Sequence, residues 1–172
     1  MSTPENDAEA FGGRRYLPNS TGCFVCGEYN EAGLRTRFFV EDGIVKMPFH
    51  VGHQHCGYPG AAHGGIIAAA LDECMGWAAA RAIRRMCVTG ELTVRYLERV
   101  PVETPLEVCA EVLRAHRRIV HTSAQLIGAT GTVYARAEGR FLPLSVEESL
   151  KVDDVLIYRG GEERVFDDLR GA

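Results

Sequence analysis

The longest run of apolar positions in this chain begins at Gly64. From Gly64 to about Arg85 the apolar residues recur at helical spacing, and over the first three turns they leave no polar face. Arginines fall in the last turns, where positive charge complements the helix dipole. We therefore predict one long helix that is buried on nearly all sides.

Two strands are predicted before this helix. Residues 34–40 and 44–49 are strand-like runs, and Glu41, Asp42 and Gly43 between them form a strong hairpin signal because glycine accepts positive φ. A loop rich in histidine and glycine then leads into the helix.

Four strand-like runs follow the helix: residues 87–97, 105–116, 119–128 and 133–144. Their connections are short, and a turn at residues 128–131 makes the last two runs a hairpin. Ser145, with Glu148 three residues further on, predicts the capping box of a short C-terminal helix. From Gly160 onward the chain is charged, and we expect it to be frayed.

The order of elements is two strands, one long helix and four strands. A lone helix without a polar face needs a single curved antiparallel sheet around it, because nothing else in the chain can cover it. This α+β architecture is the hotdog fold. We divide the 172 residues into an irregular N-terminal tail (1–20), a hotdog domain (21–145) and a C-terminal helix and tail (146–172).

Composition narrows the class of protein. The chain is 46% hydrophobic and 24% charged, as in ordinary globular proteins, and its net charge of -4 argues against a nucleic-acid partner. No stretch reaches the roughly 20 apolar residues of a membrane span, and the polar, acidic first ten residues are unlike a signal peptide. We expect a soluble, cytoplasmic protein whose six cysteines are reduced.

Three stretches resemble one family. "CFVCGEYNEAGLRTRF", "HCGYPGAAHGGIIAAALDECMGWAA" and "VTGELTVRYLERVP" are similar to the PaaI-like branch of the hotdog thioesterases, the 4-hydroxybenzoyl-CoA thioesterase superfamily. The similarity runs from about Cys23 to Leu144. It implies an enzyme that hydrolyses acyl-CoA to a free acid and CoA as a homodimer or a pair of dimers, without a cofactor or a metal.

The resemblance also implies roles for individual residues. Asp72 matches the nucleophile or general base, and the backbone N–H of Gly64 or Gly65 polarises the thioester carbonyl. Thr89 carries a hydroxyl near the attacking water, and His63 shapes the loop. The chain departs from several relatives at Gly57, where they carry Asn or Gln; a neighbour such as His55 then substitutes, or the helix terminus acts alone.

Asp72 also stands out without the resemblance. A lone carboxylate in an apolar helix costs several kcal/mol to bury unless it is paired or used. Asp72 lies on a stripe of small side chains that permits close approach of a substrate or a second subunit. Glu73 is turned by roughly 100°, so we expect only Asp72 to face the site. The alternative is a structural acid paired with an arginine on a strand.

The "HGG" of residues 63–65 supplies the second half of a site. Its glycines let a ligand approach the backbone, and the first N–H groups of a helix are unpaired, although two glycines also suit a plain tight turn. Gly64 and Asp72 are eight residues apart, about 12 Å along one helix. Both must lie within roughly 3–4 Å of one carbonyl. If both are catalytic, they come from two subunits.

Three alternatives stay open. Cys23 and Cys26 form a CxxC pattern that could complete a zinc site with nearby donors, namely His50, His53, His55 and Cys56. A hotdog dehydratase or hydratase would pair a histidine with an acid. A non-catalytic acyl-CoA binding protein would have no turnover.

Overall fold

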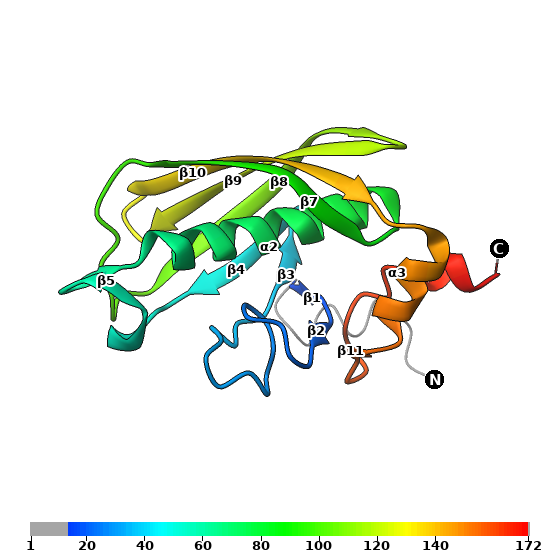
Figure 1. Cartoon of the computed structure of the whole chain (residues 1–172), viewed down its shortest axis with the longest axis horizontal. Helices are drawn as coiled ribbons and strands as arrows, with labels where there is room; N and C mark the ends of the chain where they lie inside the picture. The colour runs from blue at the N-terminus through cyan, green and yellow to red at the C-terminus, as the bar shows by residue number, and fades with distance from the viewer. Residues whose placement is uncertain (1–13, 172) are drawn as a thin grey trace.

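One long helix lies along one face of a curved sheet (Figure 1). The computed structural model describes residues 14–171. Helix α2 (Gly64–Ile83) packs on a seven-stranded sheet of order β1-β3-β4-β8-β9-β10-β7, in which every neighbouring pair is antiparallel. The predicted α+β hotdog fold is thereby confirmed.

The elements follow the predicted order. The large sheet contains β1 (Arg15–Tyr16), β3 (Phe39–Glu41), β4 (Ile44–Phe49), β7 (Cys87–Tyr96), β8 (Leu106–His116), β9 (Ile119–Gly128) and β10 (Val133–Pro143). Two small sheets pair β2 (Asn19–Ser20) with β11 (Leu156–Ile157) and β5 (Cys56–Tyr58) with β6 (Ala61–Ala62). The remaining helical segments are η1 (His53–His55), α3 (Val146–Asp153) and η2 (Asp167–Gly171).

Local sequence signals fix the turns. In the hairpin between β3 and β4, Asp42 and Gly43 have φ of 52° and 80°, the pair of positive values that a tight hairpin turn requires. At the start of α3, the Ser145 hydroxyl accepts from the Glu148 N–H while Glu148 accepts from the Ser145 N–H. Both predicted signals are confirmed, and each depends only on neighbouring residues.

The segment before β3 differs from the prediction. Residues 34–38 form no strand, although a strand was predicted from residue 34. The N–H groups of Leu34 and Thr36 donate instead to the carbonyls of Phe24 and Val25, and Arg35 has a φ of 51°. This segment therefore runs beside the loop that carries Cys23 and Cys26.

Residues 14–20 also differ from the irregular tail predicted for residues 1–20. Of residues 1–20, the first 13 lie outside the described residues. The rest are ordered by pairing, because β1 extends the large sheet and β2 pairs with β11 near the other end of the chain. Leu17 and Asn19 are buried.

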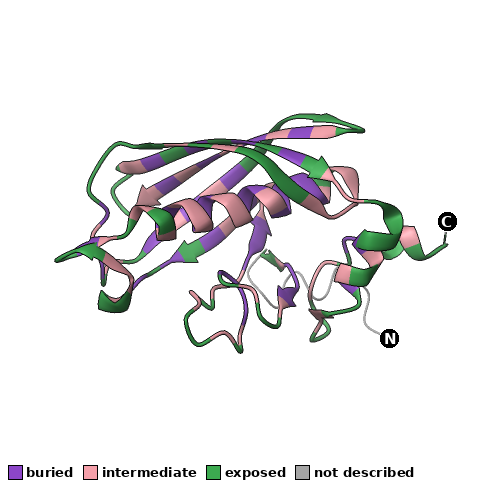
Figure 2. Cartoon of the chain, in the orientation of Figure 1, coloured by how far each residue is buried: buried purple, intermediate pink, exposed green. Residues whose placement is uncertain are grey.

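Helix α2 is buried around most of its circumference. Toward the sheet and toward the N- and C-terminal segments its buried residues are apolar: Ile67, Ala70, Leu71, Cys74, Met75, Trp77, Ala78, Ala79 and Ala80. The opposite side stays partly open along a stripe of small residues and one acid: Gly64, Gly65, Ala68, Ala69, Asp72 and Gly76 (Figure 2). The prediction of burial on nearly all sides is therefore confirmed except along this stripe.

The C-terminal segment packs into the core. Val165 and Phe166 are fully buried, and the Phe166 ring centroid lies 6.4 Å from that of Trp77. Glu163 forms a salt bridge of 3.0 Å with Arg81 on α2. The frayed tail predicted from Gly160 is therefore wrong, because two apolar residues within this charged stretch reach the core. Within residues 14–171, no helix has the length and apolar character needed to span a bilayer.

Replacing Phe166 by alanine tests this packing. We expect F166A to lower the free energy of unfolding by about 3 kcal/mol or more, since a fully buried ring leaves a cavity. Val155→Ala is the control, because Val155 is 59% exposed and its truncation should change stability by about 0.5 kcal/mol or less. Urea unfolding followed by circular dichroism measures both, and equal stabilities would contradict the packing.

Candidate functional site

A cavity of about 230 Å³ opens between α2, the edge strand β7 and the C-terminal segment. Its apolar wall includes Trp77, Phe141 and Leu156, and its polar groups include Asp72 and Thr89. None of the residues that line it between positions 14 and 171 is a histidine. A small cavity with an apolar wall and a few polar groups suits an apolar substrate fragment held next to a reactive group.

Asp72 and Thr89 form the polar pair of this cavity. The Thr89 hydroxyl donates to Oδ1 of Asp72 at 2.8 Å, joining α2 to β7. Burial raises the pKa of the half-buried Asp72, and the Thr89 hydrogen bond partly offsets this. Within the described part of the chain no lysine or arginine forms a salt bridge with Asp72, so the alternative of a structural acid paired with an arginine is not supported.

Glu73 lines the same cavity as Asp72. The expectation that only one of the two acids faces the site is therefore wrong. The helical rotation between them is real, because Glu73 turns toward the loop of Cys23 and Cys26 while Asp72 turns toward Thr89. The cavity is nevertheless wide enough to reach both Asp72 and Glu73, and Cys26 beside Glu73 also lines it.

His63 caps the start of α2. Its Nδ1 accepts a hydrogen bond of 2.9 Å from the Gly65 N–H. The Gly65 amide is therefore engaged within the chain. The Gly64 N–H, the first of the helix, donates to no acceptor among residues 14–171. Of the two predicted amide donors, Gly64 is the one available to a ligand.

Gly57 packs directly against His63. A Cβ at position 57 would lie 3.2 Å from the Cα of His63, which is closer than most side chains approach. An Asn or Gln here would require His63 to shift by a few tenths of an ångström. His55, considered as a substitute for that amide, has its Nε2 at 3.4 Å from the carbonyl oxygen of Ala32. The geometry thus favours the helix terminus acting alone.

Tyr96 is a site residue that the sequence analysis missed. Its hydroxyl, at the end of β7, donates to the Gly64 carbonyl at 2.8 Å, and its side chain is half exposed. The contact joins residues 32 positions apart, so no local spacing signals it. Tyr96 fixes the backbone of Gly64 on the open face of the chain.

Cys23 and Cys26 do not gather the predicted histidines. Among the described residues, the group of potential metal ligands consists of these two cysteines and Glu73. The donors suggested by sequence, His50, His53, His55 and Cys56, are not part of it. The histidines were predicted as ligands because they lie closer to the cysteines in sequence. Glu73 lies about fifty residues from the cysteines, so no local pattern indicates it.

Comparison with known proteins agrees with this fold. The model of the thioesterase superfamily matches residues 59–135, which include His63, Asp72 and Thr89. None of the curated proteins matches the chain.

Solved structures of thioesterase superfamily proteins share the fold. One such protein is 27% identical, with a TM-score of 0.65 over 70% of this chain and 62% of its own, so this chain spans less than two thirds of that relative. A hypothetical thioesterase from Streptococcus pneumoniae, solved with coenzyme A, is 20% identical, with a TM-score of 0.56 over 60% of this chain and 83% of its own. Zebrafish thioesterase superfamily member 2 is 19% identical, with a TM-score of 0.60 over 67% of this chain and 89% of its own. The latter two likenesses concern the fold alone.

Assignment to the PaaI-like branch stays a prediction. The match to the superfamily model covers residues 59–135, and the sheet topology and the position of the long helix agree with it. Over these residues the chain is similar to the thioesterase superfamily, and its fold is that of solved proteins of this superfamily.

Proposed function

We propose that this protein is a cytoplasmic acyl-CoA thioesterase that releases a free acid and CoA. The observation that carries the proposal is Asp72, a half-buried carboxylate held by Thr89 in a cavity and without a cationic partner among residues 14–171. Such a group is costly for stability and suited to chemistry. The six cysteines are free thiols, in keeping with a reducing compartment.

The solved relatives support a CoA ligand. The Streptococcus pneumoniae protein was solved with coenzyme A, and a protein from Streptococcus mutans was solved with acetyl-CoA bound. Two further structures of the Streptococcus pneumoniae protein replace one aspartate and one threonine by alanine. These are the residue types that form the Asp72–Thr89 pair here.

In the proposed reaction, Asp72 activates a water molecule or attacks the thioester carbonyl carbon itself. The Gly64 N–H stabilises the negative charge that develops on the carbonyl oxygen. The C–S bond then breaks, and the CoA sulfur leaves and takes up a proton that comes from water. Where Asp72 itself attacks, a water molecule then hydrolyses the mixed anhydride between Asp72 and the acyl group. In both cases the acyl group departs as the acid with one oxygen from water. Thr89 keeps the Asp72 carboxylate oriented, and the cavity holds the acyl group.

Two copies of the chain are needed for this chemistry. Gly64 and Asp72 lie on one continuous helix, about 12 Å apart, so one carbonyl cannot contact both within a chain. The small residues on the open side of α2 permit close approach, and the edge strand β7 is largely exposed. We propose that Gly64 of one subunit completes the site of Asp72 in the other, in a homodimer or a pair of dimers.

The dehydratase alternative is less well supported. It needs a histidine paired with an acid, whereas His63 is engaged by Gly65 and the described residues place no histidine in the cavity. Turnover of acyl-CoA by the wild type distinguishes an enzyme from the binding-protein alternative, because a binding protein has no turnover.

Replacing Asp72 by asparagine tests the reaction. We expect D72N to reduce thiol release from acyl-CoA substrates by roughly 100-fold or more while acyl-CoA still binds. Asp42→Asn is the control, because Asp42 is exposed in a turn with positive φ that asparagine tolerates. The assay follows thiol release with short, medium, long and aromatic acyl-CoA. A wild-type protein that binds these substrates without turnover would identify a binding protein.

Replacing Gly64 by proline tests the amide donor. Proline removes the N–H and suits the first position of a helix, and His63 before it already has a compatible extended backbone. We expect G64P to lower kcat roughly 100-fold. Gly64→Ala keeps the N–H, and its Cβ would lie 3.4 Å from the Tyr96 hydroxyl, so it should retain most activity.

Mixing the two inactive variants tests the shared site. In a heterodimer of D72N and G64P subunits, one site carries both lesions and the other carries neither. We expect co-expression with two different affinity tags to yield heterodimers with about half the wild-type activity. Heterodimers as inactive as the parent variants would place each site within one chain.

The pH dependence reports on Asp72. As a base or nucleophile, Asp72 acts when ionised, so activity falls as the pH drops through its pKa, which burial raises. Thr89→Val removes a hydrogen bond that lowers this pKa, so the acid limb of kcat/KM should move to higher pH. Thr89→Ser keeps a hydroxyl and should leave the limb in place. An unchanged acid limb in T89V would show that this limb does not report the ionisation of Asp72.

A further inference from the structure

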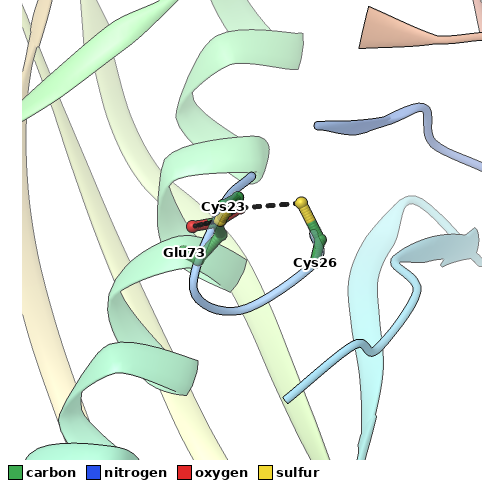
Figure 3. A group of neighbouring side chains, drawn as sticks. All are labelled: Cys23, Cys26 and Glu73. Carbon is green, nitrogen blue, oxygen red and sulfur yellow. Dashed lines mark hydrogen bonds between the residues drawn. The ribbon is translucent and has the colours of Figure 1, made fainter. Parts of the chain in front are cut away.

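Two thiols and one carboxylate meet beside the cavity. Sγ of Cys23 lies 3.1 Å from both carboxylate oxygens of Glu73, and Sγ of Cys26 lies 3.2 Å from Oε1 of Glu73. Figure 3 shows the side chains converging, with both cysteines on one loop and Glu73 on α2. All three potential ligand atoms lie within 4.8 Å of one another.

The loop that carries the cysteines is built tightly around their sulfur atoms. The N–H groups of Val25 and Ser20 approach Sγ of Cys23 and Sγ of Cys26 at 3.3 and 3.5 Å. A Cβ on Gly27 would lie 2.3 Å from the carbonyl oxygen of Cys23, so this turn admits only glycine. Backbone N–H groups directed at sulfur stabilise thiolates, the form in which cysteine binds metals.

The cluster has no cationic partner in the protein. In the described structure no lysine, arginine or histidine forms an ion pair with Glu73, although this side chain is largely buried. Two thiols and a carboxylate that share hydrogen bonds in this way release their protons when a cation binds between them.

We propose that Cys23, Cys26 and Glu73 bind one divalent cation of the Zn²⁺ class, with the fourth coordination position directed toward the cavity that Asp72 lines. Two thiolates favour zinc over magnesium or calcium. Ligands about 2.3 and 2.1 Å from a tetrahedral ion are about 3.6 Å apart, so the cluster needs to open by only about half an ångström. Cys26 and Glu73 line the cavity, which gives a water or substrate atom access to the ion.

Metal titration tests the site. The full chain, stripped with a chelator and kept reduced with a phosphine, is titrated with Zn²⁺ and analysed for bound metal, and Co²⁺ serves as a spectroscopic probe. We expect one ion per chain, thiolate-to-cobalt charge-transfer absorption, and a rise in Tm on adding Zn²⁺. Cys26→Ser and Glu73→Gln should weaken zinc binding by roughly 100-fold or more.

Cys109→Ser is the matched control. The Cys109 thiol also lies beside a carboxylate, with Sγ 3.3 Å from Oε1 of Glu107, but the group of potential ligands does not include this pair. Its replacement should leave zinc binding unchanged. If C26S does not fold, as judged by circular dichroism, Cys23→Ser at the less buried cysteine replaces it.

Three results would overturn the proposal: no zinc uptake by the reduced wild type, equal loss of uptake in C109S and C26S, or no charge-transfer band with Co²⁺. A Cys23–Cys26 disulfide in the protein as isolated, with no metal uptake after reduction, would assign the pair to redox chemistry instead. None of these measurements uses an acyl-CoA, so the metal site and the hydrolase activity stand or fall separately.

Discussion

The side of α2 that the sheet does not cover shapes the rest of this molecule. A twenty-residue helix rich in alanine and isoleucine gains stability only where its apolar side chains leave water, and one sheet can cover only one of its sides. On the other side, the chain places glycines and alanines together with the carboxylate of Asp72. The open stripe is therefore both a surface for close approach and the location of the carboxylate that we propose to react.

The neighbours of that stripe come from distant parts of the sequence. The edge strand β7 contributes Thr89 and Tyr96, which hold the acid and the first turn of the helix in place. The N-terminal loop contributes Cys26, and β11 contributes Leu156. The helix supplies the chemical groups, and elements on both sides of it in the chain set their orientation and enclose the cavity.

Much of this arrangement could be predicted from the sequence because its signals are local. The four late strands, the helix, the turn at Gly43 and the capping box at Ser145 depend on residues within a few positions of each other. Asp72 could be singled out because a carboxylate in an apolar helix contradicts its surroundings.

Other features depend on contacts that no local pattern encodes. Glu73 meets Cys23 across fifty positions, and the Tyr96 hydroxyl reaches Gly64 across 32. Phe166 packs against Trp77, which is distant from it in the sequence. The charged residues around Phe166 give no sign that its ring is buried. In each case the neighbours in sequence do not indicate the contact, because long-range packing decides the environment of the residue.

The C-terminal segment has a consequence for selectivity. Val152 and Leu156 form part of the cavity wall, yet both lie outside residues 59–135, the part of the chain that matches the superfamily. Asp72 and Thr89 thus lie within the matched residues, whereas Val152 and Leu156 belong to the C-terminal segment in which Phe166 is buried. Under the proposed function, a change in the C-terminal segment therefore alters the size of the acyl group that fits the cavity and leaves the proposed chemistry of the helix the same.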